Sequence, residues 1–267
     1  METYQGGSDV NVFSLQDKVA AVTGGGKGLG KQMVLALASF GAKVAIIDKD
    51  FPSAEKLVAE LQGRPGSPRA VAFATDVTQK SEVESTVERI CEVFERIDIL
   101  VNCAGITRRS DALSMSEADW DEVLDVNLKG VFLCCQAVGR KMVGQGTGKI
   151  INIASVVGQR GLFHPLDYAT SYCASKGGVI QLTRTLAAEW AKYNVLVNAI
   201  APTYFMTDMT RPLLENSEFK EYLKWKIPLG RPGKLEELVG PVVFFASEAS
   251  NMVTGQVLNV DGGWTAI

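Results

Sequence analysis

Short apolar runs along the chain alternate with longer segments in which apolar residues recur every three or four positions. The runs hold about four consecutive apolar residues, many of them β-branched, which is typical of strands buried on both faces of a parallel sheet. They lie at 18–26, 41–50, 69–78, 97–105, 148–155, 194–202 and 255–263. The helical segments lie between them, for example at 31–42, 81–97 and 174–193. The pattern predicts an α/β fold, a doubly wound parallel sheet of about seven strands with helices on both faces.

No linker or change of composition divides the chain. Residues 1–17 read as a polar N-terminal arm, and residues 18–267 as a single domain. The segment 204–228 is rich in aromatic residues and methionines, and we expect a lid-like helical insertion there. Ser81 with Glu84 three positions later predicts the N-cap of the helix that follows.

Charge and composition narrow the function. The net charge is −3 and no basic run occurs, which speaks against nucleic acid or an anionic membrane as partner. No apolar run has the length of a membrane span, and the N-terminus has no secretory pattern. The five cysteines show no disulfide framework and no metal spacing, so we expect reduced thiols in the cytoplasm. His164 is the single histidine, and we expect no metal site.

A glycine-rich loop, "TGGGKGLG" at 23–30, follows the first apolar run and opens a helix. Gly24, Gly28 and Gly30 allow a tight turn, close approach of backbone to phosphate, and close packing of helix on strand. The N-terminus of the helix would then face a pyrophosphate. In this position the loop predicts a dinucleotide site of the Rossmann type.

Asp48 ends the second run, at the distance from the glycine loop where an acid binds the ribose hydroxyls of adenosine. A carboxylate there repels a 2′-phosphate, which favours NAD(H) over NADP(H). Lys27 in the loop and Lys49 beside the acid are each placed to bind a phosphate. NADP(H) therefore stays open as the cofactor.

A tyrosine and a lysine lie one helical turn apart in "TSYCASKGG" at 170–178, as Tyr172 and Lys176. The glycine loop, "NCAG" at 102–105 and "YCASK" at 172–176 occur in that order. Together they resemble the short-chain dehydrogenase/reductase family, from about Lys18 to the C-terminus, where "VTGQVLNVDGGW" is also similar.

That resemblance implies a catalytic set of Asn127, Ser155, Tyr172 and Lys176. Tyr172 would take the proton of an alcohol as general base and return it in the reverse reaction. Lys176 and the positive nicotinamide of the oxidised cofactor would lower the pKa of Tyr172. Ser155 would hydrogen-bond the substrate oxygen, and Asn127 would hold a water that relays protons to Lys176.

The resemblance also implies a set of cofactor contacts and a homotetramer. Helices within 122–138 and 176–190 carry more apolar surface than one sheet face needs, as at an oligomer interface. Thr203 stands where the family has a glycine after Pro202. The implied cofactor contacts are Gly24, Lys27, Gly28, Leu29, Gly30, Asp48, Asp76, Val77, Asn102, Ala104, Gly105, Tyr172, Lys176, Pro202 and Thr207.

One spacing departs from the family pattern. The family has its serine about four residues closer to its tyrosine than Ser155 is to Tyr172. Tyr168 has the usual spacing, but the residue four positions later is Tyr172 and not a lysine. A loop lengthens at little cost, whereas the step from tyrosine to lysine is one helical turn. We therefore assign the catalytic role to Tyr172 and the insertion to 160–171.

The substrate is less well defined. "AGITRR" and "GGWTA" resemble the gluconate 5-dehydrogenase and 2-deoxygluconate 3-dehydrogenase branch, which implies interconversion of a secondary alcohol and a ketone on a polyol or sugar acid. Arg108 and Arg109, with Ser155 and Tyr172, are the candidate contacts to a small, anionic substrate. A solvated arginine pair is the alternative reading of Arg108 and Arg109.

Two other functions stay open. An NADPH-dependent 3-oxoacyl-carrier-protein-type reductase is the alternative enzyme, and Asp48 speaks against it. A dinucleotide-binding regulatory or structural protein without catalysis is the alternative of another class, and the intact catalytic set speaks against that.

Overall fold

The computed structural model describes residues 11–162 and 166–267; residues 1–10 of the predicted arm and His164 lie outside the described residues. Within these described ranges, seven strands form one parallel sheet in the order β3-β2-β1-β4-β5-β6-β7. This confirms the predicted doubly wound sheet. The strands are β1 (Val19–Thr23), β2 (Lys43–Asp48), β3 (Ala70–Ala74), β4 (Ile99–Asn102), β5 (Gly148–Ile153), β6 (Val195–Pro202) and β7 (Val257–Val260).

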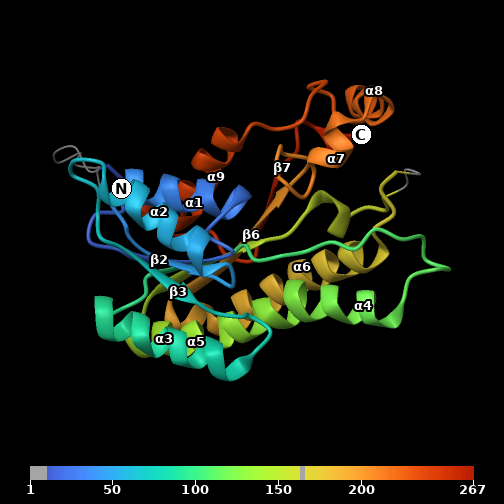
Figure 1. Ribbon diagram of the computed structural model, residues 1–267. Helices are drawn as coiled ribbons and strands as arrows, with labels where there is room; N and C mark the ends of the chain where they lie inside the picture. The colour runs from blue at the N-terminus through green and yellow to red at the C-terminus, as the bar shows by residue number, and fades with distance from the viewer. Residues whose placement is uncertain (1–10, 163–165) are drawn as a thin grey trace, which may run out of the picture.

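Helices cover both faces of the sheet (Figure 1). One face carries α1 (Gly28–Ser39), α2 (Phe51–Gln62) and α9 (Val239–Ala246). The other carries α3 (Lys80–Phe94), α4 (Glu117–Leu124), α5 (Gly130–Gln145) and α6 (Thr170–Trp190). Successive residues of β1 alternate between the two cores: Val19 and Ala21 pack with α3, α5 and α6, and Ala20 and Val22 with α1, α2 and α9. This alternation explains why the strands read as unbroken apolar runs.

The strand order reverses at β1, which pairs with β2 on one side and with β4 on the other. The connection from β1 leads to β2 on one side, and the connection from β3 crosses back to β4 on the other side. A crevice opens between these two connections at the carboxyl ends of the strands. All the strand ends that carry candidate site residues meet at this edge.

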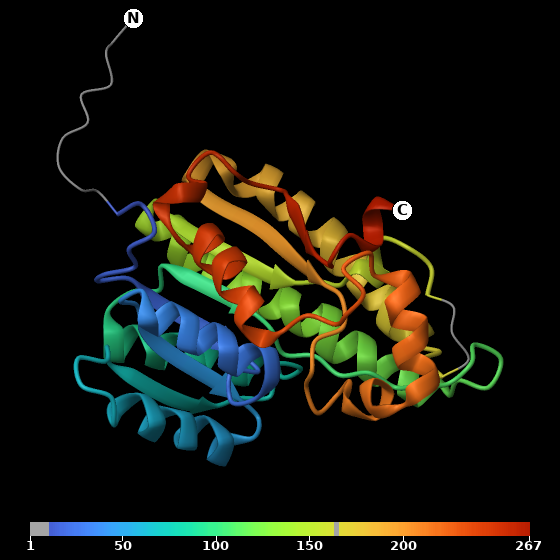
Figure 2. The same cartoon turned by 90° about the horizontal axis from the view of Figure 1, so that it is seen from above.

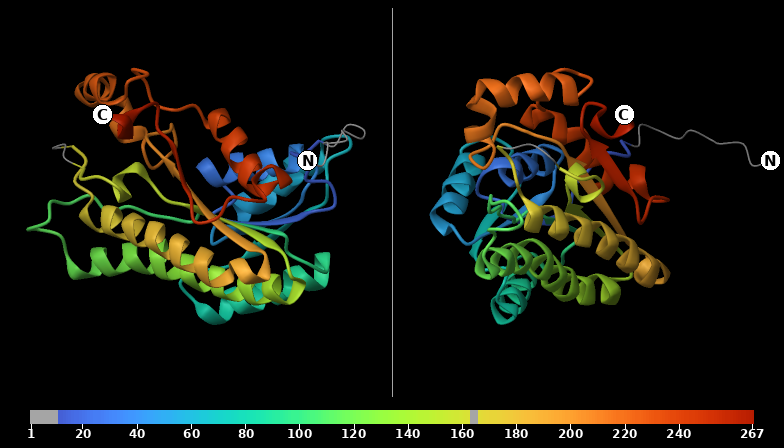
Figure 3. Two further views of the ribbon diagram at one scale, coloured as in Figure 1. Left: turned by 180° about the vertical axis from the view of Figure 1, so that it is seen from behind. Right: turned by 90° about the vertical axis from the view of Figure 1, so that its right-hand side faces the viewer.

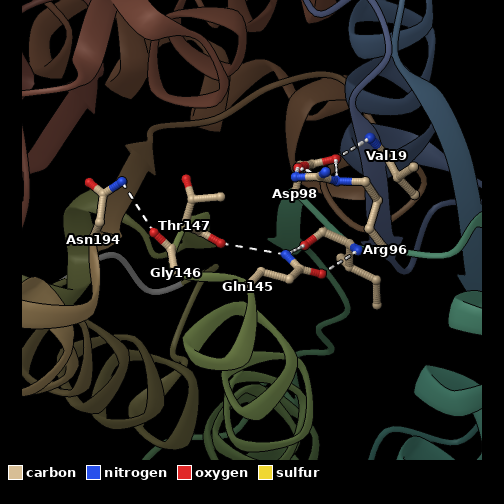
Figure 4. Close-up of polar contacts among 8 residues, drawn as sticks. Val19, Arg96, Asp98, Gln145, Gly146, Thr147 and Asn194 are labelled. Atoms are coloured by element: carbon tan, nitrogen blue, oxygen red, sulfur yellow. Dashed lines mark hydrogen bonds and ion pairs between the residues drawn. The ribbon is translucent and has the colours of Figure 1, made fainter.

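The opposite edge of the sheet holds a polar cluster that joins strand starts (Figure 4). Asp98, which is 6% exposed, accepts a hydrogen bond from the backbone N–H of Val19 at 2.9 Å and binds Arg96 in a bidentate ion pair. The side chain of Gln145 bridges to the backbone of Ile97 through its oxygen and its nitrogen. These contacts fix strand starts far from the candidate site.

The segment 204–228 forms two short helices, α7 (Arg211–Glu215) and α8 (Ser217–Lys226), beside the C-terminus (Figures 1 and 2). They project beyond the carboxyl edge of the sheet (Figure 3). Phe219 and Leu223 of α8 pack with Tyr204 and Trp264 in a third apolar cluster, separate from the two faces of the sheet. The helical part of the expected insertion is present, and its action as a lid stays a prediction.

The predicted N-cap at Ser81 is wrong. The N-cap is Gln79, two positions earlier, and helix α3 begins at Lys80. Glu82, rather than Glu84, reaches back and accepts a hydrogen bond from the backbone N–H of Asp76 at 2.8 Å. The loop after β3 therefore sets where the helix starts.

Candidate active site

A cavity of about 660 Å³ lies along the carboxyl ends of the strands at the crevice. Asn102, Asn127, Arg108 and Arg109 are the predicted site residues that do not line it. Fifteen of the predicted residues do: Gly24, Lys27, Gly28, Leu29, Gly30, Asp48, Asp76, Val77, Ala104, Gly105, Ser155, Tyr172, Lys176, Pro202 and Thr207.

Gly24 and Gly30 of the glycine loop have no room for a side chain. Gly24 has φ of 62°, and a Cβ there would lie 2.8 Å from the Cα of Ala104. A Cβ on Gly30 would lie 2.0 Å from the carbonyl oxygen of Gly24. Helix α1 begins at Gly28 without a side-chain cap and without an acidic residue in its first turn. Its first N–H groups thus face the cavity unneutralised, and the loop fits the pyrophosphate of a dinucleotide.

Asp48 is held rigidly at the end of β2. One carboxylate oxygen accepts the N–H of Gly26 and the other accepts the N–H of Asp50, both at 2.9 Å. Lys27 and Lys49, which kept NADP(H) open as the cofactor, both form ion pairs with carboxylates. Lys27 lies 2.5 Å from Asp50, and Lys49 lies 2.6 Å from Asp76.

These pairings fix the charge at that end of the cavity. The side-chain hydrogen bond to Asp50 raises the pKa of Lys27, and the one to Asp76 raises the pKa of Lys49. Both lysines therefore stay protonated, and each is balanced by a carboxylate. The end of the cavity beside Asp48 presents no unbalanced cation among its described lining residues.

Asn102 lies behind the cavity wall. Its side-chain nitrogen donates to the side-chain oxygen of Asn152 at 2.8 Å and to the sulfur of Cys135 at 3.2 Å, so it joins β4 to β5. Thr23, which the sequence did not single out, accepts the N–H groups of Cys103 and Ala104 at 3.1 and 3.2 Å. That contact holds the end of β4 against the glycine loop.

Asn127 is also buried behind the wall, within a π-helical turn at Asp125–Lys129 between α4 and α5. Its side chain accepts the N–H of Ile106 at 2.8 Å, donates to the carbonyl of Ile106 at 2.9 Å, and donates to the hydroxyl of Ser175 at 3.1 Å. A π-helical turn inside a helix occurs often at functional sites. The water relay assigned to Asn127 stays a prediction.

Ser155, Tyr172 and Lys176 meet at the inner end of the cavity. Ser155 follows β5, and Tyr172 and Lys176 lie on successive turns of α6. The Lys176 ammonium donates to the carbonyl of Ile153 at 2.7 Å. Tyr168 lies before α6 begins and is 37% exposed. It lines neither this cavity nor a second, smaller cavity that shares Ser155 and Tyr172 with it. The geometry thus brings Tyr172, and not Tyr168, to the serine and the lysine.

Burial dominates the electrostatics of this end of the cavity. It raises the pKa of Tyr172 above its ordinary value, and a hydrogen bond with Ser155 opposes that rise only in part. It also lowers the pKa of Lys176 from 10.5 to about 8. The protein by itself therefore does not lower the pKa of Tyr172 as expected. Lys176 is itself desolvated, and its ammonium is directed at the carbonyl of Ile153.

The two candidate arginines differ in placement. Arg108 pairs with Glu122 at 2.7 Å and with Asp119, and it lines neither cavity. Arg109 pairs with the buried Asp167 at 2.7 Å. It lines a smaller cavity of about 60 Å³ that shares Ser155 and Tyr172 with the larger one.

Several residues that line the larger cavity were missed. They follow strand ends or lie in the loop after β6, and that position was the signal that could have found them. They include Thr75, Thr78, Ile106, Ile153, Ala154, Thr203, Phe205, Asp208, Met209 and Thr210.

A crevice shaped for a dinucleotide that ends at a serine, a tyrosine and a lysine defines a nicotinamide-dependent oxidoreductase. Comparisons with known proteins agree. A family model described as enoyl-(acyl carrier protein) reductase matches residues 24–265. The chain therefore belongs to the short-chain dehydrogenase/reductase family, and it is an NAD(P)-dependent enzyme that interconverts a secondary alcohol and a ketone.

Individual relatives match over nearly the whole chain. The chain is 42% identical over 259 residues to 2-dehydro-3-deoxy-D-gluconate 5-dehydrogenase of Escherichia coli, covering 96% of this chain and 99% of that one. It is 43% identical over 249 residues to a 3-oxoacyl-(acyl-carrier-protein) reductase of Thermotoga maritima, covering 93% and 98%. A gluconate 5-dehydrogenase from Burkholderia cenocepacia, solved with NADP and tartrate, matches with a TM-score of 0.90 and 38% identity, covering 96% and 98%.

None of the helices in 11–162 and 166–267 is both long enough and apolar enough to span a membrane.

Proposed function

We propose that this protein oxidises a secondary alcohol of a polyol or sugar acid, and reduces the matching ketone, with Tyr172 as the proton-transferring residue. The observation that carries the proposal is the shared cavity. Ser155, Tyr172 and Lys176 line one end of it, and the glycine loop and Asp48 line the other. A nicotinamide dinucleotide bound along this cavity would accept a hydride in oxidation and donate one in reduction, beside Tyr172.

Ser155, Tyr172 and Lys176 at the inner end of the cavity each have a separate role in the proposed reaction. Ser155 donates a hydrogen bond to the reacting oxygen and orients it toward Tyr172. As the carbinol C–H bond breaks and its hydride leaves, the Tyr172 oxygen takes the hydroxyl proton, and in reduction it returns that proton. The positive charge of an oxidised nicotinamide opposes the burial that raises the pKa of Tyr172. Lys176 holds Tyr172 in place and passes the proton onward through the water expected at Asn127.

For the cofactor we propose NAD(H) over NADP(H). Asp48 is locked by two backbone N–H groups, so it cannot swing away from a 2′-phosphate. Lys27 and Lys49 are engaged with carboxylates, so binding that phosphate would first break an ion pair. The Burkholderia cenocepacia enzyme, solved with NADP, is the reason why the preference needs a direct measurement.

For the substrate, support comes from the relatives. The E. coli protein is named for a gluconate derivative and the B. cenocepacia protein for gluconate. A 3-oxoacyl-carrier-protein reductase remains the alternative, favoured by the T. maritima relative. Arg109, Asp167 and Thr203 offer hydrogen-bonding groups to a hydroxylated substrate on one wall of the smaller cavity, which also has apolar lining residues such as Val156 and Leu162.

Assembly and location complete the proposal. We propose a homotetramer in the cytoplasm with reduced cysteines. Phe132 of α5 is 40% exposed, which supports an apolar face beyond the needs of the sheet. Light scattering measures the assembly, and a monomer at working concentration would contradict it.

Absorbance of the reduced nicotinamide tests the activity. We expect turnover of polyols or sugar acids, with NAD+ preferred to NADP+. Turnover of 3-oxoacyl substrates with NADPH, and of no polyol or sugar acid, would establish the alternative enzyme. Tight dinucleotide binding without turnover of any substrate in either direction would establish the non-catalytic alternative.

A further inference from the structure

A buried polar network forms the far wall of the smaller cavity. Asp167, 4% exposed, accepts a hydrogen bond from Arg109 at 2.7 Å and another from the hydroxyl of Tyr204. Arg109 also donates to the carbonyl of Met209 at 3.4 Å. All four residues line the cavity, together with Ser155 and Tyr172. The network therefore lies beside the candidate reaction centre and carries no net charge.

Two hydroxyls on the same cavity have no hydrogen-bond partner among the described residues. They are the Oγ1 atoms of Thr107 and Thr203, and both are buried. A buried hydroxyl without a protein partner is uncommon and costly, and a water or a polar ligand group is needed to satisfy it. A hydroxyl donates one hydrogen bond and accepts two, so the best match is a ligand that both donates and accepts.

The two departures from the family pattern meet at this cavity. Asp167 lies within 160–171, where the sequence places the extra loop residues. Thr203 stands where the family has a glycine. Their side chains come from segments more than thirty residues apart and line the same wall. These two departures from the family pattern thus lie together beside Ser155 and Tyr172, where a substrate would be recognised.

We propose that this wall selects a neutral, polyhydroxylated substrate, a polyol or its ketose, over the corresponding sugar acid, with Asp167 as the specificity-determining residue. The inference rests on the proposed function and names the substrate class of that site. A volume of about 60 Å³ corresponds to about two water-sized groups, which suits the hydroxylated end of the carbon chain beyond the reacting carbon.

The charges argue for a neutral ligand. Asp167 balances Arg109, so the arginine has no net charge to offer a carboxylate. A carboxylate in this cavity would stand beside the buried Asp167, and like charges in such proximity repel strongly. The remaining N–H groups of Arg109 can still donate to hydroxyl oxygens. Burial and the neighbouring Asp167 raise the pKa of Tyr204, so its hydroxyl stays protonated as a donor.

Matched substrate pairs test the proposal. Glucitol, mannitol and galactitol differ from gluconate, mannonate and galactonate only at one end, where CH2OH stands against a carboxylate. We expect kcat/KM for the best hexitol to exceed that for its own acid by about tenfold or more. The Asp167→Asn variant keeps both hydrogen-bonding positions, since the amide can accept from Arg109 and donate to Tyr204. This variant should raise the ratio of kcat/KM for the acid to kcat/KM for the hexitol by about 10- to 100-fold.

Two further variants keep the test decisive. Asp111→Asn makes the same change at an exposed carboxylate that lines neither cavity, and it should leave the ratio unchanged. Thr203→Val removes one partnerless hydroxyl at constant shape, so it should fold, and it should raise the KM for the hexitol with little change in the ratio. Cofactor titration reports that each variant is folded.

The outcomes separate the two proposals. An acid preferred by the parent enzyme, or an Asp167→Asn ratio equal to that of the parent, overturns the specificity proposal and leaves the oxidoreductase intact. No turnover of any of the six compounds, or of their keto forms with either cofactor, overturns the proposed function and the specificity proposal with it.

Discussion

The ammonium of Lys176 lies 5.5 Å from the centre of the Tyr172 ring and donates a hydrogen bond of 2.7 Å to the carbonyl of Ile153. The lysine is therefore fixed by β5 as well as by its own helix. Its ammonium lies over the Tyr172 ring, so the lysine supports the position of that ring. The two residues act together because α6 begins at Thr170, just before Tyr172, so that both belong to its first turns.

Tyr172→Phe should abolish proton transfer and leave cofactor binding intact. The change removes one hydroxyl and keeps the ring, so the cavity wall survives. Turnover should fall by about a hundredfold to ten-thousandfold. Steady-state kinetics measure the loss, and cofactor titration by fluorescence checks that the site remains.

Tyr168→Phe is the matched control for that variant. Tyr168 lies outside both cavities, so its effect should be confined to KM through the loop before α6. An inactive Tyr168→Phe beside an active Tyr172→Phe would require the catalytic assignment to be rebuilt around Tyr168.

The pH dependence should differ between the two directions. Oxidation needs Tyr172 deprotonated, so its rate should rise with pH. Reduction needs Tyr172 protonated, so its rate should fall only at high pH, because burial raises the pKa of Tyr172 and a reduced nicotinamide brings no positive charge to oppose it. In the pH–rate profiles, the rise of the oxidation rate should therefore be centred at a lower pH than the fall of the reduction rate. Lys176→Met should move the rise of the oxidation rate to higher pH. A rise and a fall centred at the same pH would contradict this account.

Lys176 should also affect stability with a defined sign. Burial lowers its pKa to about 8, whereas the unfolded chain has the ordinary value of 10.5. Below pH 8 the folded protein bears the full cost of a buried charge. Between pH 8 and 10.5 the unfolded state binds more protons, so the stability contributed by this group rises with pH. Urea unfolding should show Lys176→Met more stable than the parent near pH 7, with the difference shrinking toward pH 10.

The sequence was sufficient for the sheet and for most of the cavity. Strands β1, β4, β5 and β6 contribute residues to the apolar clusters on both faces of the sheet, so their apolar runs are continuous and easy to recognise. Gly24, Asp48 and Lys176 follow from local rules, because strand ends and a single helical turn place them. The position of Asn102 behind the wall was not accessible in the same way, because its partners Cys135 and Asn152 come from elements distant in sequence.

Side-chain contacts between residues distant in the sequence could not be predicted. Asp167 and Tyr204 are 37 positions apart and meet only because the loop before α6 and the loop after β6 fold over the same cavity. The predicted start of α3 was wrong for a related reason. Asp76 is bonded to Lys49 and Glu82, and that loop begins the helix before Ser81 is reached.

Asp98 should matter for stability and not for catalysis. It accepts the buried N–H of Val19 and pairs with Arg96 at the edge of the sheet opposite the cavity (Figure 4). Asp98→Ala leaves that N–H without a partner, which should lower the free energy of unfolding by about 1–3 kcal/mol. The urea midpoint should fall, while kcat and KM at low temperature stay unchanged. A large loss of kcat in a fully folded variant would show that the two edges are coupled.

Asp48→Asn should weaken the preference for NAD(H). The amide oxygen can still accept the N–H of Gly26, so the glycine loop keeps its support. The N–H of Asp50 loses its acceptor, and the negative charge is removed. A 2′-phosphate would no longer meet a like charge, and like-charge contacts cost several kcal/mol. We therefore expect the ratio of the NADP+ to the NAD+ dissociation constant to fall by at least about tenfold, which is about 1.4 kcal/mol. Asp50→Asn is the matched control, because it releases Lys27 and leaves the Asp48 carboxylate charged; it should improve NADP+ binding less. If the parent enzyme already binds NADP+ more tightly and Asp48→Asn leaves the ratio unchanged, Lys27 governs the cofactor preference, and it leaves Asp50 when the phosphate binds.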